Sequence, residues 1–189
     1  MNKLKIISAT VRPGRKGPAV GQWISTLAKA DGRFEVEFID LGELKLPLMD
    51  EPNHPVMQKY EHEHTKKWSA VINEADTFIF VTGEYDFGYP APLRNALEFL
   101  YKEWNFKAAG IVSYGGVSAG TRAANALKND LSTFKVVPLY EAVNIPFFTE
   151  HINEEGIFEP RESSIKAAKV LFNELERWTR GLKIIRADA

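Results

Sequence analysis

The sequence predicts an α/β fold, a doubly wound parallel sheet of about five strands with helices on both of its faces. Two observations predict this fold. Short apolar stretches typical of buried strands alternate along the chain with longer amphipathic stretches typical of helices. Three loops of unusual composition each follow one of the predicted strands. A chain of 189 residues with 44% hydrophobic residues is expected to form one domain, residues 1–189, around a substantial core.

The first strand is predicted at Leu4–Ala9, where the residues are mostly apolar, and a basic turn follows it. A helix is predicted to start near Pro18, because proline suits the first turn of a helix. Its apolar face is formed by Val20, Ile24, Leu27 and Ala28. Phe34–Ile39 alternates between apolar and charged residues and is predicted to be the second strand. The stretch 41–55, rich in Pro, Asp and Asn, is predicted to be a loop.

The rest of the chain continues the same alternation of helix and strand patterns. The predicted elements are a helix at 57–75, a strand at 77–81, a helix at 91–101, a strand at 108–113, a helix at 121–131, a strand near 136–139 and a helix with apolar residues at 165, 168, 171, 172, 175 and 178. Gly181 is predicted to end that last helix. The order of elements favours a flavodoxin-like sheet with the strand order 2-1-3-4-5.

A sheet of this kind binds ligands beyond the carboxyl ends of its strands, between the first and third strands. The unusual loops at 10–17, 83–92 and 113–120 all follow strands and should therefore meet at this edge. The first loop is basic and leads into a helix, which suits a phosphate group. The other two offer flat aromatic surfaces and glycine amides, which suit a planar heteroaromatic ring. Together they favour a mononucleotide, and flavin mononucleotide (FMN) fits best.

Simpler interpretations of the same loops stay open. The basic loop lacks the spacing of a P-loop and of a dinucleotide-binding motif, so it could be a solvated turn. Phe87 and Tyr89 could merely cover the end of the sheet, and Gly115-Gly116 could be an ordinary turn. Each of these interpretations is reasonable when taken singly. The shared position of the three loops argues against all of them together.

Composition and residue spacing argue against several other functions. The chain has no cysteine, which excludes disulfides and thiolate chemistry and fits a reducing cytoplasm. A net charge of −1 gives no general attraction for nucleic acid, and no stretch is apolar enough to span a membrane. His62 and His64 would point apart on a helix, so no metal site is predicted there; they are expected on a solvated face, with His64 against the core.

Three stretches of the chain resemble the NADPH-dependent FMN reductases, a flavodoxin-like family that includes quinone, azo and chromate reductases. The resemblance extends from Lys3 to about Trp178, and the second of the three stretches is the most specific. The stretches are Ala9-Thr10-Val11-Arg12-Pro13-Gly14-Arg15-Lys16-Gly17, Gly83-Glu84-Tyr85-Asp86-Phe87-Gly88-Tyr89-Pro90-Ala91-Pro92-Leu93-Arg94-Asn95-Ala96, and Ser113-Tyr114-Gly115-Gly116 with Gly120 and Arg122.

The resemblance implies which residues hold the cofactor. The FMN phosphate would be held by Thr10, Arg12, Gly17, Pro18, Ala19 and Val20. The isoalloxazine and ribityl groups would be lined by Glu84, Tyr85, Asp86, Phe87 and Gly88 on one side and by Ser113, Tyr114, Gly115 and Gly116 on the other. The chain departs from the family pattern in three places: Ala9-Thr10 replaces Gly-Ser, Gly83 replaces Pro, and Asp86 replaces Asn.

The activity implied by the resemblance is transfer of hydride from NADPH or NADH, through FMN, to a small electron acceptor such as a quinone, an azo compound, a flavin or a metal oxyanion. The cofactor performs this chemistry, so no catalytic acid or base is assigned. A homodimer or homotetramer is implied, with the aromatic segment 97–104 either at the interface or in the core. The alternative is a flavodoxin-like electron carrier or a flavin-binding regulator; the near-neutral charge argues against a carrier.

Overall fold

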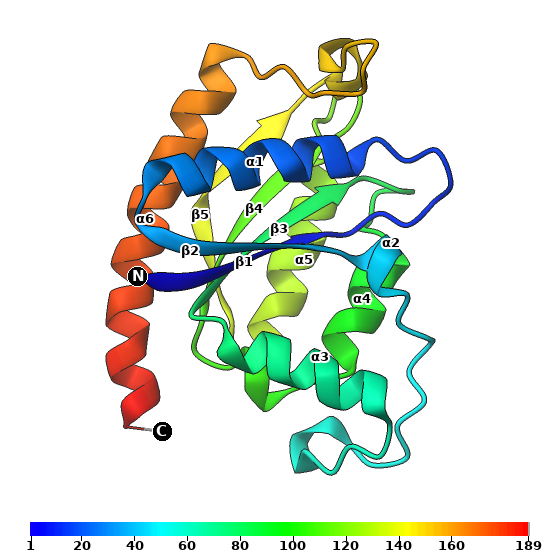
Figure 1. Cartoon of the computed structure of the whole chain (residues 1–189), viewed down its shortest axis with the longest axis vertical. Helices are drawn as coiled ribbons and strands as arrows, with labels where there is room; N and C mark the ends of the chain where they lie inside the picture. Colours follow the sequence, from blue (N-terminus) through cyan, green and yellow to red (C-terminus); the bar gives the residue numbers. More distant parts are fainter. Residues whose placement is uncertain (189) are drawn as a thin grey trace.

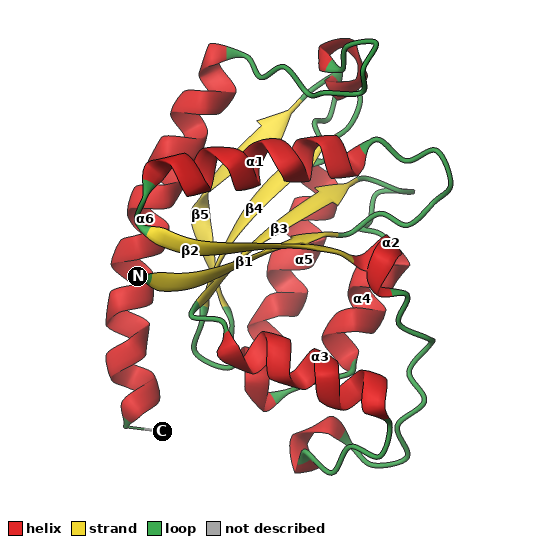
Figure 2. Ribbon diagram, in the orientation of Figure 1, coloured by secondary structure: helices red, strands yellow, loops and turns green. Residues whose placement is uncertain are grey.

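The computed structural model describes residues 1–188, and its centre is a five-stranded parallel sheet. The strands are β1 (Asn2–Ser8), β2 (Phe34–Asp40), β3 (Thr77–Gly83), β4 (Ala108–Tyr114) and β5 (Val137–Ile145). Their order is β2-β1-β3-β4-β5, and every neighbouring pair is parallel. The predicted fold class and strand order are therefore confirmed (Figures 1 and 2).

Helices cover both faces of the sheet, as a sheet with parallel strands requires. On one face lie α1 (Gly17–Asp31) and α6 (Glu162–Ala187); on the other lie α3 (Glu63–Glu74), α4 (Ala91–Glu98) and α5 (Thr121–Thr133). A single turn, α2 (Leu41–Leu44), follows β2, and short 3-10 turns cover 55–57, 102–104 and 148–151. Because β3 and β4 are buried on both faces, every one of their residues is buried, which explains their largely apolar sequences.

The sheet separates two hydrophobic cores. Ile6 and Ile79 point toward α1 and α6, and Phe78 and Phe80 point toward α3, α4 and α5. The core between the sheet and α3, α4 and α5 is rich in aromatic rings. In it, the ring centroids of Trp104 and Phe78 lie 5.1 Å apart. These cores fix the sheet, and the sheet in turn holds the loops at the carboxyl ends of its strands.

Two helices are shorter than the sequence predicts. Helix α3 begins at Glu63 and not at 57, because the Glu51 carboxylate accepts hydrogen bonds from the backbone amides of Glu61 (2.8 Å) and His62 (3.0 Å) and holds that segment extended. Helix α4 ends at Glu98 and not at 101, because the chain turns there to bury the aromatic residues that follow.

The aromatic segment 97–104 belongs to the core of its own chain. Phe99 and Trp104 are fully buried, and the indole of Trp104 donates a 3.1 Å hydrogen bond to the carbonyl of Leu97. Of the two interpretations offered for this segment, the core packing is the one observed. These two side chains are therefore closed off from any contact with a second subunit.

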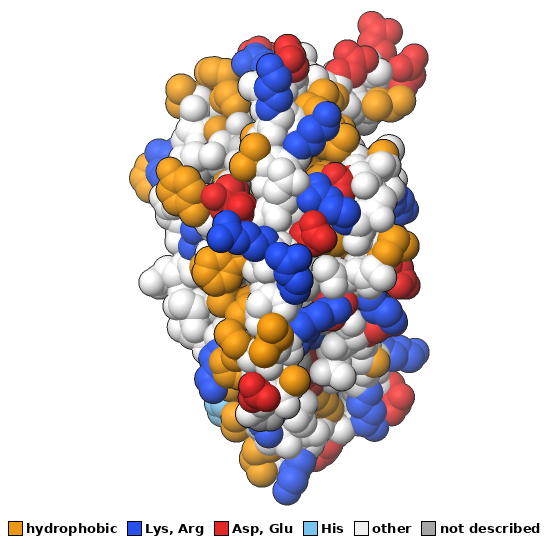
Figure 3. All heavy atoms as spheres, turned by 90° about the vertical axis from the view of Figure 1, so that its left-hand side faces the viewer, with side chains coloured by type: hydrophobic (Ala, Val, Ile, Leu, Met, Phe, Trp, Pro, Cys, Tyr) orange, Lys and Arg blue, Asp and Glu red, His pale blue; other side chains and the backbone are white. Residues whose placement is uncertain are grey.

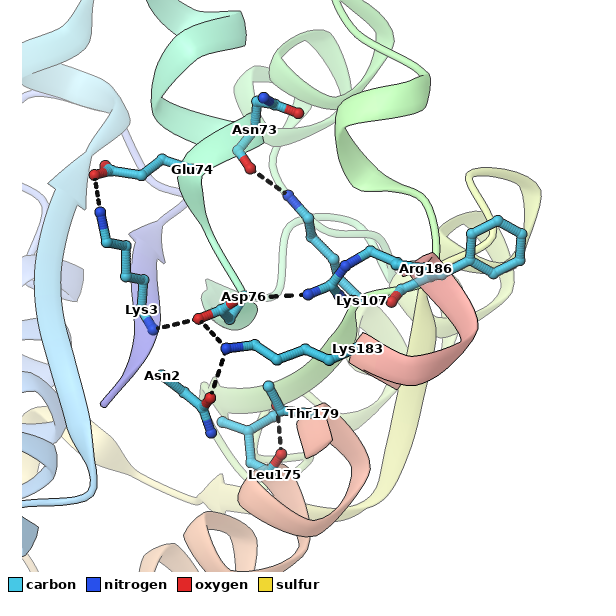
Figure 4. Close-up of polar contacts among 11 residues, drawn as sticks. Asn2, Lys3, Asn73, Glu74, Asp76, Lys107, Leu175, Thr179, Lys183 and Arg186 are labelled. Atoms are coloured by element: carbon cyan, nitrogen blue, oxygen red, sulfur yellow. Dashed lines mark hydrogen bonds and ion pairs between the residues drawn. The ribbon is translucent and has the colours of Figure 1, made fainter. Parts of the chain in front are cut away.

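The last helix continues through Gly181 to Ala187, so the prediction that Gly181 ends it is wrong. Glycine inside a helix costs only about 1 kcal/mol, and polar contacts of the last turns offset that cost. Lys183 lies 2.7 Å from one oxygen of Asp76, and Arg186 lies 3.4 Å from the other (Figure 4). Trp178, the last of the apolar residues that repeat at helical spacing along this helix, is 45% exposed.

The surface over α6 carries no single block of one kind of side chain. Trp178, Ile184 and Ile185 are exposed there, and hydrophobic side chains on this side of the molecule lie among lysines and arginines (Figure 3). No helix within residues 1–188 is both long and apolar enough to cross a membrane.

The predicted orientation of His62 and His64 is wrong. His62 precedes α3 as its N-cap and does not lie within the helix, so the helical spacing does not apply. The two rings stack with their centroids 5.3 Å apart, and the Nε2 atom of His64 lies 2.9 Å from a carboxylate oxygen of Asp50. His64 also meets Phe99 edge-on, in agreement with its predicted place against the core.

Candidate functional site

A cavity of about 290 Å³ opens at the carboxyl edge of the sheet, where β1 and β3 lie side by side. The loops after these two strands lie together on the right-hand side of Figure 1. The cavity is lined by Thr10, Arg12, Gly14, Arg15, Lys16, Gly17, Gly83, Glu84, Tyr85, Tyr114, Gly115, Phe148 and Thr149. It therefore lies at the point of the sheet where such folds bind their ligands.

The first wall of the cavity is the loop between β1 and α1. Thr10 is 2% exposed, and its hydroxyl lies 3.3 Å from the hydroxyl of Tyr114. Helix α1 begins at Gly17 with no side-chain cap and no acidic residue in its first turn. Pro18 has no amide hydrogen, and the Ala19 amide donates to the Lys16 carbonyl (3.2 Å). This helix end therefore offers the Gly17 amide together with a positive partial charge, which favours an anion.

Gly17 is required by the close packing of this wall. A Cβ atom at Gly17 would lie 2.0 Å from the Tyr114 hydroxyl and 2.5 Å from the Thr10 hydroxyl. Any larger residue would push both hydroxyl groups away from the start of the helix. The two hydroxyls and the helix N-terminus thus form one small polar cradle, which we call the anion cradle.

The basic residues of this loop differ in what they contact. The Arg15 guanidinium lies 2.8 Å from Asp40 and 3.5 Å from Glu43, and the bond to Asp40 raises the pKa of Arg15. Arg15 therefore ties the loop to the end of β2. Arg12 lines the cavity and is exposed, so its charge is available to a bound anion.

The second wall is the loop between β3 and α4, which forms a tight turn. The backbone groups of Tyr85 and Gly88 exchange hydrogen bonds of 2.9 and 2.8 Å. Between them, Asp86 (φ 47°) and Phe87 (φ 67°) both have left-handed backbone conformations, as a type I′ turn requires. Aspartate adopts this conformation readily, but a phenylalanine there costs about 1–3 kcal/mol.

The strained Phe87 is held in place from the first turn of α5. The Arg122 guanidinium lies 4.0 Å from the centroid of the Phe87 ring, in a cation–π arrangement. Arg122 in turn donates a 2.6 Å hydrogen bond from Nε to the Glu84 carboxylate. Glu84 also accepts from the Ser118 hydroxyl and from the backbone amide of Arg122, at 3.2 Å each.

Glu84 therefore joins the loop after β3 to the N-terminus of α5 (Thr121–Thr133). The hydrogen bond from Arg122 lowers the pKa of Glu84 below its ordinary value of 4.5, so the carboxylate is ionised at neutral pH. The positive end of a helix favours a carboxylate in this position. This contact fixes the two loops relative to each other before any ligand binds.

The floor of the cavity is Tyr114, at the end of β4. Its ring packs 4.5 Å from the ring of Phe148, and its burial raises its pKa to about 12, so the hydroxyl is protonated. A Cβ atom at Gly83 would lie 3.1 Å from this ring. The glycine that departs from the family pattern therefore leaves room for Tyr114.

The predicted site residues fall into four groups, of which three line the cavity or lie in or beside its first two walls. Thr10, Arg12, Gly17, Glu84, Tyr85, Tyr114 and Gly115 line the cavity. Pro18, Ala19 and Val20 form the first turn of α1, where Val20 faces the core, so only its backbone can contribute to a site. Asp86 and Phe87 are exposed at the tip of the hairpin, and Gly88 closes it.

The remaining predicted residues, Ser113 and Gly116, do not line the cavity. The Ser113 hydroxyl is buried between the carbonyl of Ala119 and the side chain of Asn144, at 2.8 Å from each. The cavity also includes Phe148 and Thr149, which the sequence did not indicate. They follow β5, and their position just beyond a strand is the one signal that could have suggested them.

The cavity suits a ligand with a phosphate group and a planar ring. The anion cradle supplies hydroxyl donors and a helix N-terminus with no competing acidic side chain. Tyr85, Tyr114 and Phe148 supply aromatic surfaces beside it. FMN, which ends in a single phosphate, has both features, so the residues present fit this cofactor.

This fold with this cavity defines a flavodoxin-like protein with a mononucleotide-type site. The family model described as "NADPH-dependent FMN reductase" matches residues 2–150. The chain therefore belongs to the NADPH-dependent FMN reductase family, and its general role is that of an oxidoreductase.

Two curated relatives illustrate the range of the family. The chain is 41% identical to an NAD(P)H-dependent FMN reductase of Schizosaccharomyces pombe over 148 residues, which are 76% of this chain and 74% of the relative. It is 34% identical to an NADPH:quinone oxidoreductase of Arabidopsis thaliana over 101 residues, about half of each protein.

Among solved structures, the chain is similar to FerB, a flavoenzyme NAD(P)H:(acceptor) oxidoreductase from Paracoccus denitrificans. The two folds agree with a TM-score of 0.75 over 96% of this chain and 98% of FerB, at 22% sequence identity. At this identity the similarity establishes the shared fold alone.

Proposed function

We propose that this protein is an FMN-dependent NAD(P)H oxidoreductase that passes hydride from a reduced nicotinamide nucleotide to a small acceptor. The single observation that carries this proposal is the anion cradle of Thr10, Gly17 and Tyr114 beside an aromatic cavity at the switch point of the sheet. Membership of the family and the activities for which the relatives are named support it.

The roles of the residues follow from their positions. Thr10 and the Gly17 amide at the start of α1 would hold the phosphate, and Arg12 would neutralise its charge. Tyr85 and Tyr114 would bound the ring system and exclude water from part of it. FMN, when bound, supplies the hydride-transfer chemistry, so the protein needs no acid or base of its own.

The Glu84–Arg122 pair has a supporting role in this proposal. Because it fixes the Tyr85–Gly88 hairpin to α5, the hairpin does not have to become ordered when the cofactor binds. A wall that is already in place reduces the entropy lost on binding. The pair would therefore act on affinity for FMN and not on the hydride transfer itself.

The acceptor class is a quinone, an azo compound, a free flavin or a metal oxyanion; the relative from Arabidopsis thaliana, a quinone oxidoreductase, favours a quinone. We further propose that residues 1–189 act as one domain, that the protein is a homodimer or homotetramer, and that it lies in the cytoplasm, consistent with its lack of cysteine.

Three measurements on the purified protein test the proposal. The visible absorption spectrum should show bound flavin, and mass spectrometry of the cofactor released by heat should identify FMN and not FAD. Addition of NADPH without oxygen should then bleach the flavin band rapidly. Bound FMN that NADPH fails to reduce would favour the electron carrier or regulator instead, and failure to bind any flavin would refute both.

A further inference from the structure

A second cavity, of about 310 Å³, lies next to the candidate site. It is lined by Val11, Leu41, Gly42, Lys45, Leu46, Leu48, Ala91, Pro92 and Asn95. Thr10 and Arg12 line the first cavity, whereas Val11, which lies between them in sequence, lines the second. The β1–α1 loop is therefore a wall that the two cavities share.

The loop after β3 also borders both cavities. Its first part, Glu84 and Tyr85, lines the candidate site, and its continuation into α4, Ala91 and Pro92, lines the second cavity. An acceptor that reacts beside Tyr85, where the ring of the cofactor would lie, thus has the second cavity further along the same loop. The second cavity is the natural place for a substituent of such an acceptor.

The outer wall of the second cavity has a fixed backbone. Asn95 donates a 2.7 Å hydrogen bond from its amide to the carbonyl of Pro47, and its side-chain oxygen accepts a 2.9 Å hydrogen bond from the amide of Met49. Leu48 lies between these two anchored residues, and 84% of it is exposed. An aliphatic side chain held in water beside an apolar cavity favours an apolar ligand that covers it.

The chemistry of the lining narrows the class of ligand. Lys45 is the one charged residue among the lining residues, and the others are aliphatic, small or neutral. The volume lies at the lower end of the range for small-molecule pockets, about 300–1,000 Å³. The cavity therefore suits an alkyl or isoprenoid group better than a second charged group.

We propose that this cavity binds the apolar side chain of a quinone whose ring reacts at the candidate site. The proposal rests on the proposed function and adds a substrate preference to it: quinones with an alkyl chain should be better acceptors than the same ring without one. In the overall reaction NADPH gives up a hydride, water supplies one proton, and the quinone leaves as the hydroquinone together with NADP⁺.

The test uses the FMN-loaded protein, NADPH and two acceptors, 2,3-dimethoxy-5-methyl-1,4-benzoquinone and its 6-decyl derivative. In the wild type, kcat/KM for the decyl compound should exceed that for the parent ring by about tenfold or more, since burial of each methylene group is favourable. Ala91→Phe, which places a large ring in the second cavity, should bring this ratio close to one. Ala91 is exposed in the first turn of α4, so this variant should fold.

Ala30→Phe is the matched control, because Ala30 is also exposed on a helix but lies at the far end of α1, outside both cavities. It should keep the wild-type ratio. Binding is measured separately by methyl NMR of leucine-labelled protein: the decyl quinone should shift the signals of Leu41 and Leu48 in the wild type and in Ala30→Phe, but not in Ala91→Phe.

The outcomes separate this proposal from the proposed function. A wild type that reduces both quinones equally well, or an Ala91→Phe variant that keeps the preference, would overturn the tail-binding cavity and leave the reductase intact. A wild type that reduces neither quinone would overturn both. If Ala91→Phe dissociates an oligomer in sedimentation without changing the ratio, a second copy of the chain covers the cavity and the proposal fails.

Discussion

The burial of Lys107 makes a quantitative prediction about how stability changes with pH. Lys107 immediately precedes β4, at the edge of the sheet opposite the candidate site, and it is 4% exposed. Its ammonium group donates hydrogen bonds to the carbonyls of Ile72 (2.7 Å) and Asn73 (3.1 Å) at the end of α3, and Figure 4 shows the bond to Asn73. Burial lowers its pKa from 10.5 to about 7.

The direction of the effect follows from proton binding. Between about pH 7 and 10.5 the unfolded chain holds a proton on Lys107 and the folded chain releases it, so the free energy of unfolding rises with pH across this range. The full difference between the two pKa values corresponds to roughly 5 kcal/mol. Between pH 7 and pH 9 the expected gain is about 2–3 kcal/mol, since one proton contributes at most ~1.4 kcal/mol per pH unit.

Lys107→Met keeps most of the side-chain volume and removes the titrating group. Its free energy of unfolding should therefore lack this rise, although the carbonyls of Ile72 and Asn73 lose a donor at every pH. The assay is urea unfolding at several pH values from 7 to 9, read as the difference between variant and wild type, so that all other titrating groups cancel.

Phe78→Leu is the control, because the Phe78 ring lies 5.6 Å from the Lys107 ammonium group and its loss should lower stability while leaving the lysine in place. Its free energy of unfolding, plotted against pH, should run below that of the wild type and parallel to it. If the curve of Lys107→Met is also parallel to the wild type between pH 7 and 9, then the carbonyls of α3 keep the lysine charged in the folded protein and the reasoning is refuted.

Three predictions concern the candidate site. Arg12→Ala should weaken FMN binding by about 1.5–3 kcal/mol, the range for a hydrogen bond to a charged group; an unchanged Kd in a titration of apoprotein would make Arg12 a surface charge only. Asp86→Asn should raise the two-electron potential of bound FMN, because a carboxylate near the flavin repels the reduced anion. Asp86 is exposed, so about 0.2–1 kcal/mol is expected, or roughly 5–20 mV in a dye-coupled titration, and a fall would contradict it. The Glu84–Arg122 contact lowers the pKa of Glu84, so it stabilises the fold above pH 4.5 and is lost as the pH falls further. Glu84→Gln should therefore lose less stability than the wild type on acidification in urea titrations, and equal losses would exclude the pair as the cause.

Much of the fold could be read from the sequence because burial on two faces leaves a clear pattern. The stretches at β3 and β4 are largely apolar, since every residue of both strands is buried. The order of strands and helices then leaves few ways to form a parallel sheet. This pattern located the carboxyl edge of the sheet, and with it the loops that line the cavity.

The helix ends that were predicted wrongly depend on contacts between distant residues. The start of α3 is set by the Glu51 carboxylate, which binds amides ten and eleven positions along the chain. The passage of α6 through Gly181 is supported by Asp76, which lies far away in the sequence, just before β3. Local propensity cannot report such bonds, because the partner is brought close only by the folded chain.

The sequence by itself determined the doubly wound sheet and the three loops that meet at its edge, because hydrophobic periodicity and turn residues are local properties. The tertiary structure alone decided what each loop residue does there. It turned the Ser113 hydroxyl away from the cavity, placed the Tyr114 hydroxyl against Gly17, and brought in Phe148 from beyond β5. The physical reason is that a side chain's role depends on neighbours supplied by other strands, and the packing of those strands is settled only when the whole core forms.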